Sequence, residues 1–241
     1  MRLVLLHGFT QSPPVWDGVR AHLVDCAGAG VEVVTPEVPD GLGFIATAQA
    51  VVETAGEAVY CGYSMGGRLC LRGALDRPDL VRGLVLVSAS PGIADDRERA
   101  RRAQHDDKLA SEARTLGVEA FLRRWLAQPL FSTLKAADGE VTRRARSTDV
   151  DRLAHQLRAL GQGAQAPLWD RLHELHVPVA VVTGRDDLKY DAVGDAMAAT
   201  IPGCVRVRLQ GGHALPLEQP EGLATALLDV VQRVAVHGPT S

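Results

Sequence analysis

Gly62-Tyr63-Ser64-Met65-Gly66 has the pattern Gly-x-Ser-x-Gly and lies between a β-rich run (58–61) and a helical pattern (67–75). A strand that turns sharply into a helix places its middle residue on a tight corner. Glycines flank such a corner because a side chain there would collide with the neighbouring strand and helix. We therefore expect the Ser64 hydroxyl to project from the carboxyl edge of a sheet. The Met65 N–H, at the start of a helix, is then free to donate.

Strands and helices alternate along the chain on both sides of this turn. Continuous apolar runs are typical of strands buried on both faces of a sheet, and helical patterns separate them here. This order predicts an α/β fold with a mostly parallel, doubly wound sheet. A Gly-x-Ser-x-Gly turn in this setting is typical of the nucleophile elbow of the α/β-hydrolase fold. The expected strands are 2–7, 31–36, 58–61, 83–88, 178–184 and 205–209, and the expected helices are 13–28, 44–54, 67–75 and 220–234.

The alternation stops between residues 91 and 176, where only helical patterns occur. These patterns are broken at Pro129 and near Gly139 and Gly161. We expect a helical cap at 91–176, inserted above an α/β-hydrolase core formed by 1–90 and 177–241. The two antiparallel strands that commonly begin this fold are absent. Either the chain is a compact variant, or it starts downstream of its true beginning.

Length and composition argue against several classes of function. The chain has 241 residues, of which 46% are hydrophobic, and a net charge of −3. These values are ordinary for a globular domain with a large core, and they favour neither a nucleic-acid nor a membrane partner. No apolar run approaches roughly 18 residues, and no secretory leader is recognisable, so we expect a cytoplasmic protein. The sequence does not indicate an oligomeric state.

Cysteine spacing gives no sign of a metal site. The chain has no Cys-x-x-Cys motif, and we expect Cys61 and Cys70, which lie in apolar surroundings, to be buried free thiols. No metal or organic cofactor is expected. The four cysteines are Cys26, Cys61, Cys70 and Cys204.

A serine at an elbow needs a base, and the base needs an acid that orients it. In α/β hydrolases these residues follow in the order Ser, acid, His. Asp187 is the fourth residue of a Gly-x-x-Asp turn after a strong strand, and His213 follows the last strand. We predict that Ser64, Asp187 and His213 form a catalytic triad, with Asp186 as the rival for the acid.

An oxyanion hole needs two N–H donors. One is expected from Met65. The other is expected from the loop 7–10 after the first strand, where we favour the Phe9 N–H.

Longer motifs resemble one family of this superfamily over most of the chain. The elbow continues as Gly-Gly-Arg, ending at Arg68, and Asp187 is followed by Leu-Lys-Tyr. The chain resembles the 2-succinyl-6-hydroxy-2,4-cyclohexadiene-1-carboxylate (SHCHC) synthases of menaquinone biosynthesis. The other segments that carry the resemblance are Ser90–Arg102, Trp125, 128–131, Arg146-Ser147, Gly212-His213 and 218–220.

The resemblance implies a lyase that eliminates pyruvate from an enolpyruvyl cyclohexene bearing succinyl and carboxylate groups. In that family the triad acts as a base and is not acylated. The resemblance also implies that several residues hold or enclose the small, polycarboxylate substrate. A substrate with several carboxylates suits fixed arginine side chains in a largely dry pocket. The residues that match family positions are Tyr63, Arg68, Arg102, Trp125 and Arg146.

One departure from the family and two rival functions remain open. Relatives usually carry a Pro-Gly-His-Gly-type turn after the second strand, whereas this chain has the loop 36–43 with a different sequence. The first rival is a carboxylic-ester or carbon–carbon bond hydrolase that acts through an acyl-enzyme on Ser64. The second is a non-catalytic ligand-binding relative, which the intact triad argues against.

Overall fold

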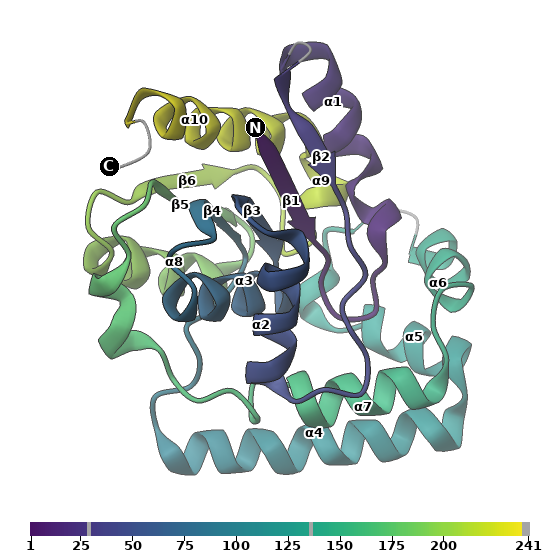
Figure 1. Ribbon diagram of the computed structural model, residues 1–241. Coiled ribbons are helices and arrows are strands. Elements are labelled where there is room, and N and C mark those ends of the chain that lie inside the picture. Colours follow the sequence, from purple (N-terminus) through teal and green to yellow (C-terminus); the bar gives the residue numbers. More distant parts are fainter. Residues whose placement is uncertain (28–29, 135–136, 238–241) are drawn as a thin grey trace.

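The computed structural model of the protein describes residues 1–27, 30–134 and 137–237. Within them, six parallel strands form one sheet in the order β2-β1-β3-β4-β5-β6, which confirms the predicted fold class (Figure 1). The central strands are buried on both faces, as their continuous apolar runs predict. The strands are β1 (Arg2–Leu6), β2 (Glu32–Val34), β3 (Ala58–Tyr63), β4 (Val81–Val87), β5 (Val179–Gly184) and β6 (Val205–Leu209).

Helices cover both faces of the sheet (Figure 1). On one face α2, α3 and α8 pack against it, and on the other face α1 and α10 do so. Cys61 and Cys70 are buried and free, as expected. The helices of the core are η1 (Pro13–Trp16), α1 (Asp17–Ala27), α2 (Phe44–Ala55), α3 (Met65–Asp76), α8 (Leu188–Thr200), α9 (Leu215–Glu218) and α10 (Pro220–His237).

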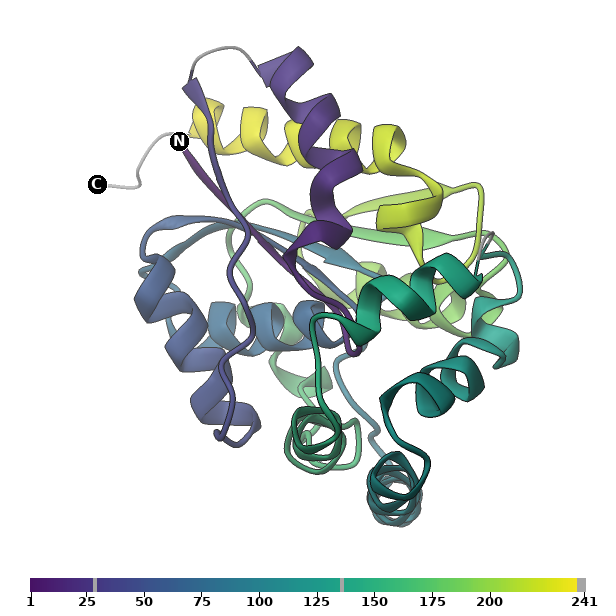
Figure 2. The same ribbon diagram turned by 90° about the vertical axis from the view of Figure 1, so that its right-hand side faces the viewer.

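The described residues between β4 and β5 form helices joined by loops, and none of them lies in a strand. Four helices gather at the carboxyl end of the sheet, where the arrow of β1 points toward them (Figure 2). We call α4 to α7 the helical insert. The breaks predicted near Gly139 and Gly161 agree with the helix bounds: η3 ends at Phe131 and α6 begins at Ala137, two residues before Gly139, and α7 ends just before Gly161. The segment contains α4 (Asp96–Leu116), α5 (Val118–Leu126), η3 (Pro129–Phe131), α6 (Ala137–Ala145), α7 (Val150–Leu160) and η4 (Trp169–Glu174).

The last part of this segment packs on the core. Leu168, Leu172 and Leu175 are buried in the same apolar cluster as the residues of α3 and α8. Arg171 of η4 donates to Asp76 and to the carbonyl oxygen of Leu75 at the end of α3. Residues 168–175 therefore pack like part of the core. The predicted end of the cap at residue 176 stays a prediction.

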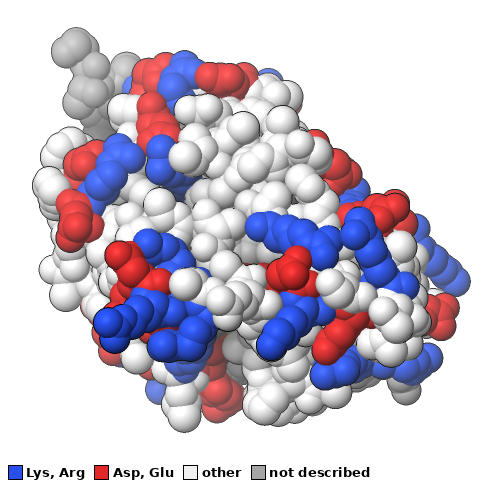
Figure 3. Space-filling view, turned by 90° about the horizontal axis from the view of Figure 1, so that it is seen from below, with Lys and Arg blue, Asp and Glu red and all other residues white. Residues whose placement is uncertain are grey.

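The outer face of the helical insert carries charges of both signs. Figure 3 shows this face from below, with blue and red side chains interspersed. Ion pairs such as Arg114–Asp151 and Arg158–Asp107 connect α4 with α7. Such exposed pairs contribute little to stability, and they leave no large surface of one sign. No helix among the described residues is long and apolar enough to cross a membrane.

Candidate active site

The turn between β3 and α3 holds Ser64 in a strained conformation. Its φ and ψ angles are 52° and −109°, in a region that non-glycine residues rarely adopt. A Cβ on Gly62 would lie 2.4 Å from the backbone of Gly66, and one on Gly66 would lie 2.3 Å from the carbonyl oxygen of Leu6. Side chains at these two positions are therefore excluded, for the reason that the pattern indicates.

The structure brings Ser64, His213 and Asp187 into one hydrogen-bond chain. His213 Nε2 lies 3.1 Å from Ser64 Oγ, and His213 Nδ1 lies 2.6 Å from Asp187 Oδ2. Because a carboxylate accepts hydrogen bonds, Nδ1 carries the proton and Nε2 is free to accept from Ser64. Asp186, the rival for the acid, is exposed, and the carboxylate that contacts His213 belongs to Asp187.

Backbone contacts hold the histidine and the aspartate in place. Asp187 caps α8, where its Oδ1 accepts from the Tyr190 N–H at 3.4 Å. Glu218 accepts from the N–H of Gly212 at 2.7 Å and of Ala214 at 3.0 Å, on both sides of His213. The position of His213 is therefore fixed by its own flanking peptide groups as well as by Asp187.

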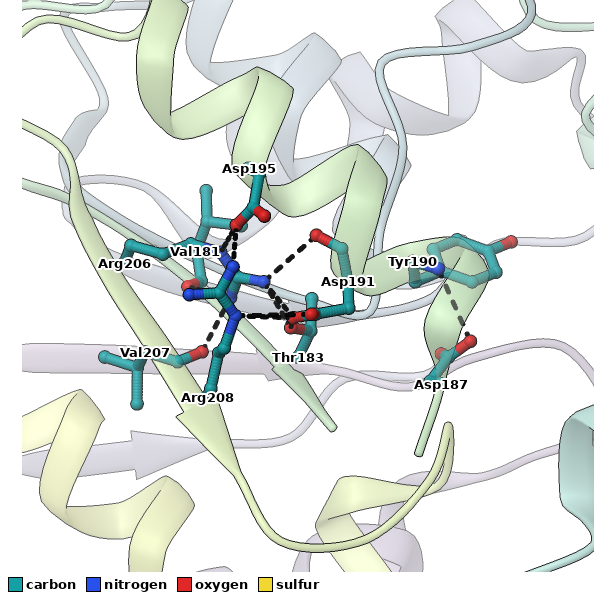
Figure 4. A network of polar contacts seen from close by, with 9 residues as sticks. All are labelled: Val181, Thr183, Asp187, Tyr190, Asp191, Asp195, Arg206, Val207 and Arg208. Atoms are coloured by element: carbon teal, nitrogen blue, oxygen red, sulfur yellow. Dashed lines mark hydrogen bonds and ion pairs between the residues drawn. The ribbon is translucent and has the colours of Figure 1, made fainter. Parts of the chain in front are cut away.

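A network of arginines and aspartates ties α8 to the last two strands (Figure 4). Arg206 donates to Thr183 Oγ1 at 2.6 Å and to carboxylate oxygens of Asp191 and Asp195. Arg208 donates to the same two aspartates. Asp191 lies one turn after Asp187 in α8, so the network fixes the start of the helix that carries the acid.

Phe9 and Met65, the predicted oxyanion donors, both line the cavity beside Ser64. Met65 is the first residue of α3, where backbone N–H groups have no partner within the helix. Phe9 follows His7, which is buried and whose Nδ1 lies 2.9 Å from the carbonyl oxygen of Gly8. His7 Nε2 lies 3.3 Å from both the Val38 nitrogen and Glu37 Oε2, so His7 connects this loop with the loop 36–43.

The cavity above Ser64 has a volume of about 300 Å³ and lies between the sheet and the helical insert. Three aromatic rings surround the imidazole of His213, those of Tyr63, Phe131 and Tyr190, at centroid distances of 5.5, 5.9 and 4.6 Å. Trp125 of α5 packs edge-on against Phe9 at 4.9 Å. These rings make the surroundings of His213 largely apolar, which strengthens electrostatic interactions there.

Arg68 is buried in the wall of this cavity, and its hydrogen-bond partners among the described residues are neutral. Its side chain donates to Gln165 Oε1 at 3.0 Å and to the carbonyl oxygen of Leu160 at 2.7 Å, both of them neutral. Among the described residues, no carboxylate lies within ion-pair distance of its guanidinium. Burial lowers the pKa of Arg68 to about 10, so the side chain stays charged at neutral pH. An uncompensated buried charge is costly unless a ligand supplies the counter-charge.

Arg102 of α4 also lines the cavity but has an acid partner. Its Nε donates to Asp106, one turn later and almost fully buried, at 2.7 Å. Its Nη1 donates to Gln162 Oε1 at 3.0 Å. Asp106 and Gln162 thus hold the guanidinium in one orientation at the edge of the cavity.

The structure does not bring Arg146 to the cavity. Its side chain is exposed, just past the end of α6, and it is not among the cavity-lining residues. The buried arginine of this helix is Arg144, which donates to Thr10 Oγ1 at 2.7 Å and to Glu140 at 3.1 Å. Side chains two positions apart on a helical turn point in nearly opposite directions, which places Arg146 in solvent. The structure therefore does not place Arg146 beside Arg68 and Arg102 in the cavity lining, although the resemblance implies that Arg146 holds the substrate.

Sequence reasoning also missed residues that shape the site. Tyr190, Gln162 and Gln165 contact the predicted residues, yet nothing in the local sequence marks a glutamine as a partner of a distant arginine. Asp106 could have been found, because it lies four residues after Arg102, at the spacing of a helical ion pair.

The loop 36–43 contacts the helical insert. Arg152 of α7 donates to Glu37 at 2.8 Å and to the carbonyl oxygen of Val38 at 3.3 Å. His155 Nε2 lies 3.1 Å from the carbonyl oxygen of Leu42. The loop thus connects α7 with the backbone around His7.

Comparisons with known proteins agree with this geometry. The profile of the alpha/beta hydrolase family matches residues 3–226. A Bacillus subtilis (strain 168) protein, whose name gives the SHCHC synthase activity as provisional, is 32% identical over 90% of this chain and 85% of its own. The SHCHC synthase of Serratia proteamaculans (strain 568) is 27% identical over 93% and 91%. The solved structure of MenH from S. aureus superimposes with a TM-score of 0.87 at 25% identity, over 98% of this chain and 94% of that one.

Proposed function

Because the chain belongs to the alpha/beta hydrolase family and, within it, to the SHCHC synthases, we propose that it is a lyase of menaquinone biosynthesis. Its substrate is an enolpyruvyl cyclohexene that carries a succinyl group and a ring carboxylate. The reaction removes a proton α to a carbonyl group and expels pyruvate. The named relatives and the site geometry support this proposal.

Ser64 takes the proton, and His213 receives the proton of the serine hydroxyl. Asp187 keeps the imidazole in the tautomer that accepts at Nε2. The C–H electron pair forms an enolate, whose oxygen accepts from the N–H groups of Phe9 and Met65. The bond from the ring carbon to the enolpyruvyl oxygen then breaks, and pyruvate enolate takes up the proton held by His213. Protons and electrons balance without a cofactor.

The unpaired charge of Arg68 is the observation that carries the proposal. A cavity for neutral esters has no use for a buried guanidinium that meets only neutral acceptors. A substrate carboxylate would supply the missing counter-charge through charge-assisted hydrogen bonds. In this proposal Arg102, Tyr63 and Trp125 enclose the same ligand, the insert acts as a cap, and the protein works in the cytoplasm.

The second candidate is a serine hydrolase. The hydrogen bond between Ser64 and His213 suits acyl transfer as well as proton abstraction. In that reaction Ser64 Oγ would attack a carbonyl carbon, and an ester would form on the serine. The two functions therefore differ in what happens to Ser64 and in the charge of the preferred substrate.

Pyruvate release tests the proposal. The enolpyruvyl substrate is offered to the enzyme, and pyruvate is measured through lactate dehydrogenase and NADH oxidation. We expect turnover by the wild type and a loss on the order of 10³-fold or more in Ser64→Ala. Rapid hydrolysis of p-nitrophenyl acetate without pyruvate from the enolpyruvyl substrate would favour the hydrolase.

A further inference from the structure

Tyr190 lies beside the triad in the first turn of α8. Its ring packs on the imidazole of His213, and its side chain lines the cavity above Ser64. Figure 4 shows the ring directed away from the network of Arg206 and Arg208, with the hydroxyl at the far end. The hydroxyl is thus separate from the contacts that anchor the helix.

Arg102 fixes the direction of the hydrogen bond that Tyr190 receives. A guanidinium has only donors, so its contact with Gln162 at 3.0 Å requires Gln162 Oε1 as the acceptor. The other end of this carboxamide, Nε2, then faces Tyr190 and donates to the phenol oxygen at 2.7 Å. The reverse orientation of the carboxamide would set two donors against each other at Arg102. The Tyr190 oxygen is therefore an acceptor in this contact, and its own proton remains unused.

The unused proton has no acceptor among the described residues. The contact with Gln162 is the one hydrogen bond of the Tyr190 hydroxyl in this part of the chain. Buried phenol groups normally use their proton in a hydrogen bond. Since Tyr190 forms part of the cavity wall, an acceptor can come from a ligand in the cavity.

The surroundings of the hydroxyl favour an acceptor with negative charge. Burial raises the pKa of Tyr190, and the positive charges of Arg68 and Arg102 oppose this effect, so both arginines act on the phenol. Arg102 also pulls electron density from the carbonyl group of Gln162, which makes its amide a stronger donor to Tyr190. Such polarisation along a hydrogen-bond chain makes the phenol O–H itself a stronger donor.

We propose that Tyr190 is a substrate-binding residue, whose hydroxyl donates a hydrogen bond to a carboxylate oxygen of a ligand held beside Arg68 and Arg102. The identity of the ligand rests on the proposed function, whereas the direction of the hydrogen bond does not. Gln162 acts as a positioning residue, because it occupies the phenol oxygen and leaves the proton for the ligand.

Binding of the enolpyruvyl tricarboxylate to the Ser64→Ala variant, measured by calorimetry, tests this role without turnover. Adding Tyr190→Phe removes the hydroxyl and keeps the ring, so we expect the dissociation constant to rise about 10- to 100-fold. Tyr60→Phe, in the same background, is the matched control. It removes a buried hydroxyl that lies against the carbonyl oxygens of Val52 and Gly56, away from the cavity, and the dissociation constant should not change.

A second variant tests the direction of the hydrogen bond. Gln162→Glu has no N–H, so its carboxylate accepts from both Arg102 and Tyr190 and uses the phenol proton. Its added charge weakens binding by itself, but in this background Tyr190→Phe should cost less than about twofold, because the proton is no longer available. Non-additive effects of the two substitutions on the dissociation constant are expected if Arg102, Gln162, Tyr190 and the ligand form one hydrogen-bond chain. A merely structural tyrosine would cost the same in both backgrounds.

The outcomes separate this inference from the proposed function. Equal binding with and without the Tyr190 hydroxyl, in variants with unchanged melting temperatures, overturns the inference alone. Weaker binding without the hydroxyl, combined with no pyruvate release by the wild type, supports Tyr190 and overturns the lyase. Absence of binding to every variant overturns both.

Discussion

Replacing Arg68 by Met should change the activity strongly and the free energy of unfolding only little. Arg68 is 6% exposed and makes two hydrogen bonds, both to neutral acceptors. Met has a similar length and no charge, so it fills the same space along the wall of the cavity. The perturbation therefore removes a buried positive charge without opening a large void.

Two opposing terms set the expected change in the free energy of unfolding. The variant leaves Gln165 Oε1 and the Leu160 carbonyl oxygen without these donors, which costs about 1–3 kcal/mol for each. It also removes the cost of burying an unpaired guanidinium, which is several kcal/mol. Because these terms are of similar size, we expect stability to change by about 2 kcal/mol or less in either direction.

The expected change in activity is larger and depends on the charge of the substrate. Among the described residues, two of the five N–H donors of Arg68 are used, which leaves three that a carboxylate can engage. One charge-assisted hydrogen bond contributes about 1.5–3 kcal/mol, so kcat/KM for the enolpyruvyl substrate should fall about 10- to 150-fold. Arg68→Lys should restore only part, since an ammonium group cannot make two parallel bonds to a carboxylate.

The assay compares pyruvate release with p-nitrophenyl acetate hydrolysis, together with urea unfolding of each variant. Arg72→Met is the matched control, because Arg72 lies one turn later on α3 and pairs with Asp76 at 2.6 Å, outside the cavity lining. It should lose stability and keep its activity. Equal losses of Arg68→Met on the charged and neutral substrates would show that Arg68 does not recognise the charge of the substrate, as would unchanged activity on both.

Three further predictions address the triad, the loop 36–43 and a buried thiol. Asp187→Asn should lower kcat about 10³- to 10⁴-fold by favouring the wrong tautomer of the histidine, whereas Asp186→Asn should leave pyruvate release unchanged; the reverse result would reassign the acid. The contact with His7 and the positive charge of Arg152 in α7 hold the pKa of Glu37 below its usual range. The ionised Glu37 carboxylate thus stabilises the folded protein at neutral pH, and this stabilisation is lost as the pH falls through the lowered pKa. The difference in melting temperature between wild type and Glu37→Gln should therefore shrink in acid, and a difference that grows in acid would contradict this. Burial raises the pKa of Cys70 to about 12, so peptide mapping should find it unlabelled by iodoacetamide at pH 8 until the protein unfolds, and labelling of the folded protein would contradict its burial.

Local patterns predicted the parts of the fold that depend on neighbouring residues. The glycines around Ser64 report a steric requirement that exists within a few residues of the turn. The order of strands and helices placed Asp187 and His213 at the ends of β5 and β6, and parallel strands bring these ends to one edge. The sequence therefore led to the hydrogen-bonded chain of Ser64, Asp187 and His213, although their separation along the chain is large.

The arginines were harder to predict because their surroundings come from distant segments. Arg68 lies in the first turn of a helix whose position the elbow determines, and it does reach the cavity. Arg146 follows α6, whose rotation depends on how Arg144 packs against Thr10 and Glu140, and no local pattern shows which side chain turns inward. Gln162 and Gln165, the side-chain partners of Tyr190 and Arg68, come from the segment after α7, 28 and 97 residues away in the sequence.

In the proposed elimination of pyruvate, Ser64 acts as a base and is never acylated. A single-turnover reaction with enzyme in excess over the enolpyruvyl substrate tests it directly, with quenching at successive times and intact-mass measurement of the protein. We expect one equivalent of pyruvate for each substrate molecule, while the protein mass stays that of the unmodified chain throughout. A transient mass increase that maps to the peptide containing Ser64, and that disappears as product forms, would contradict it.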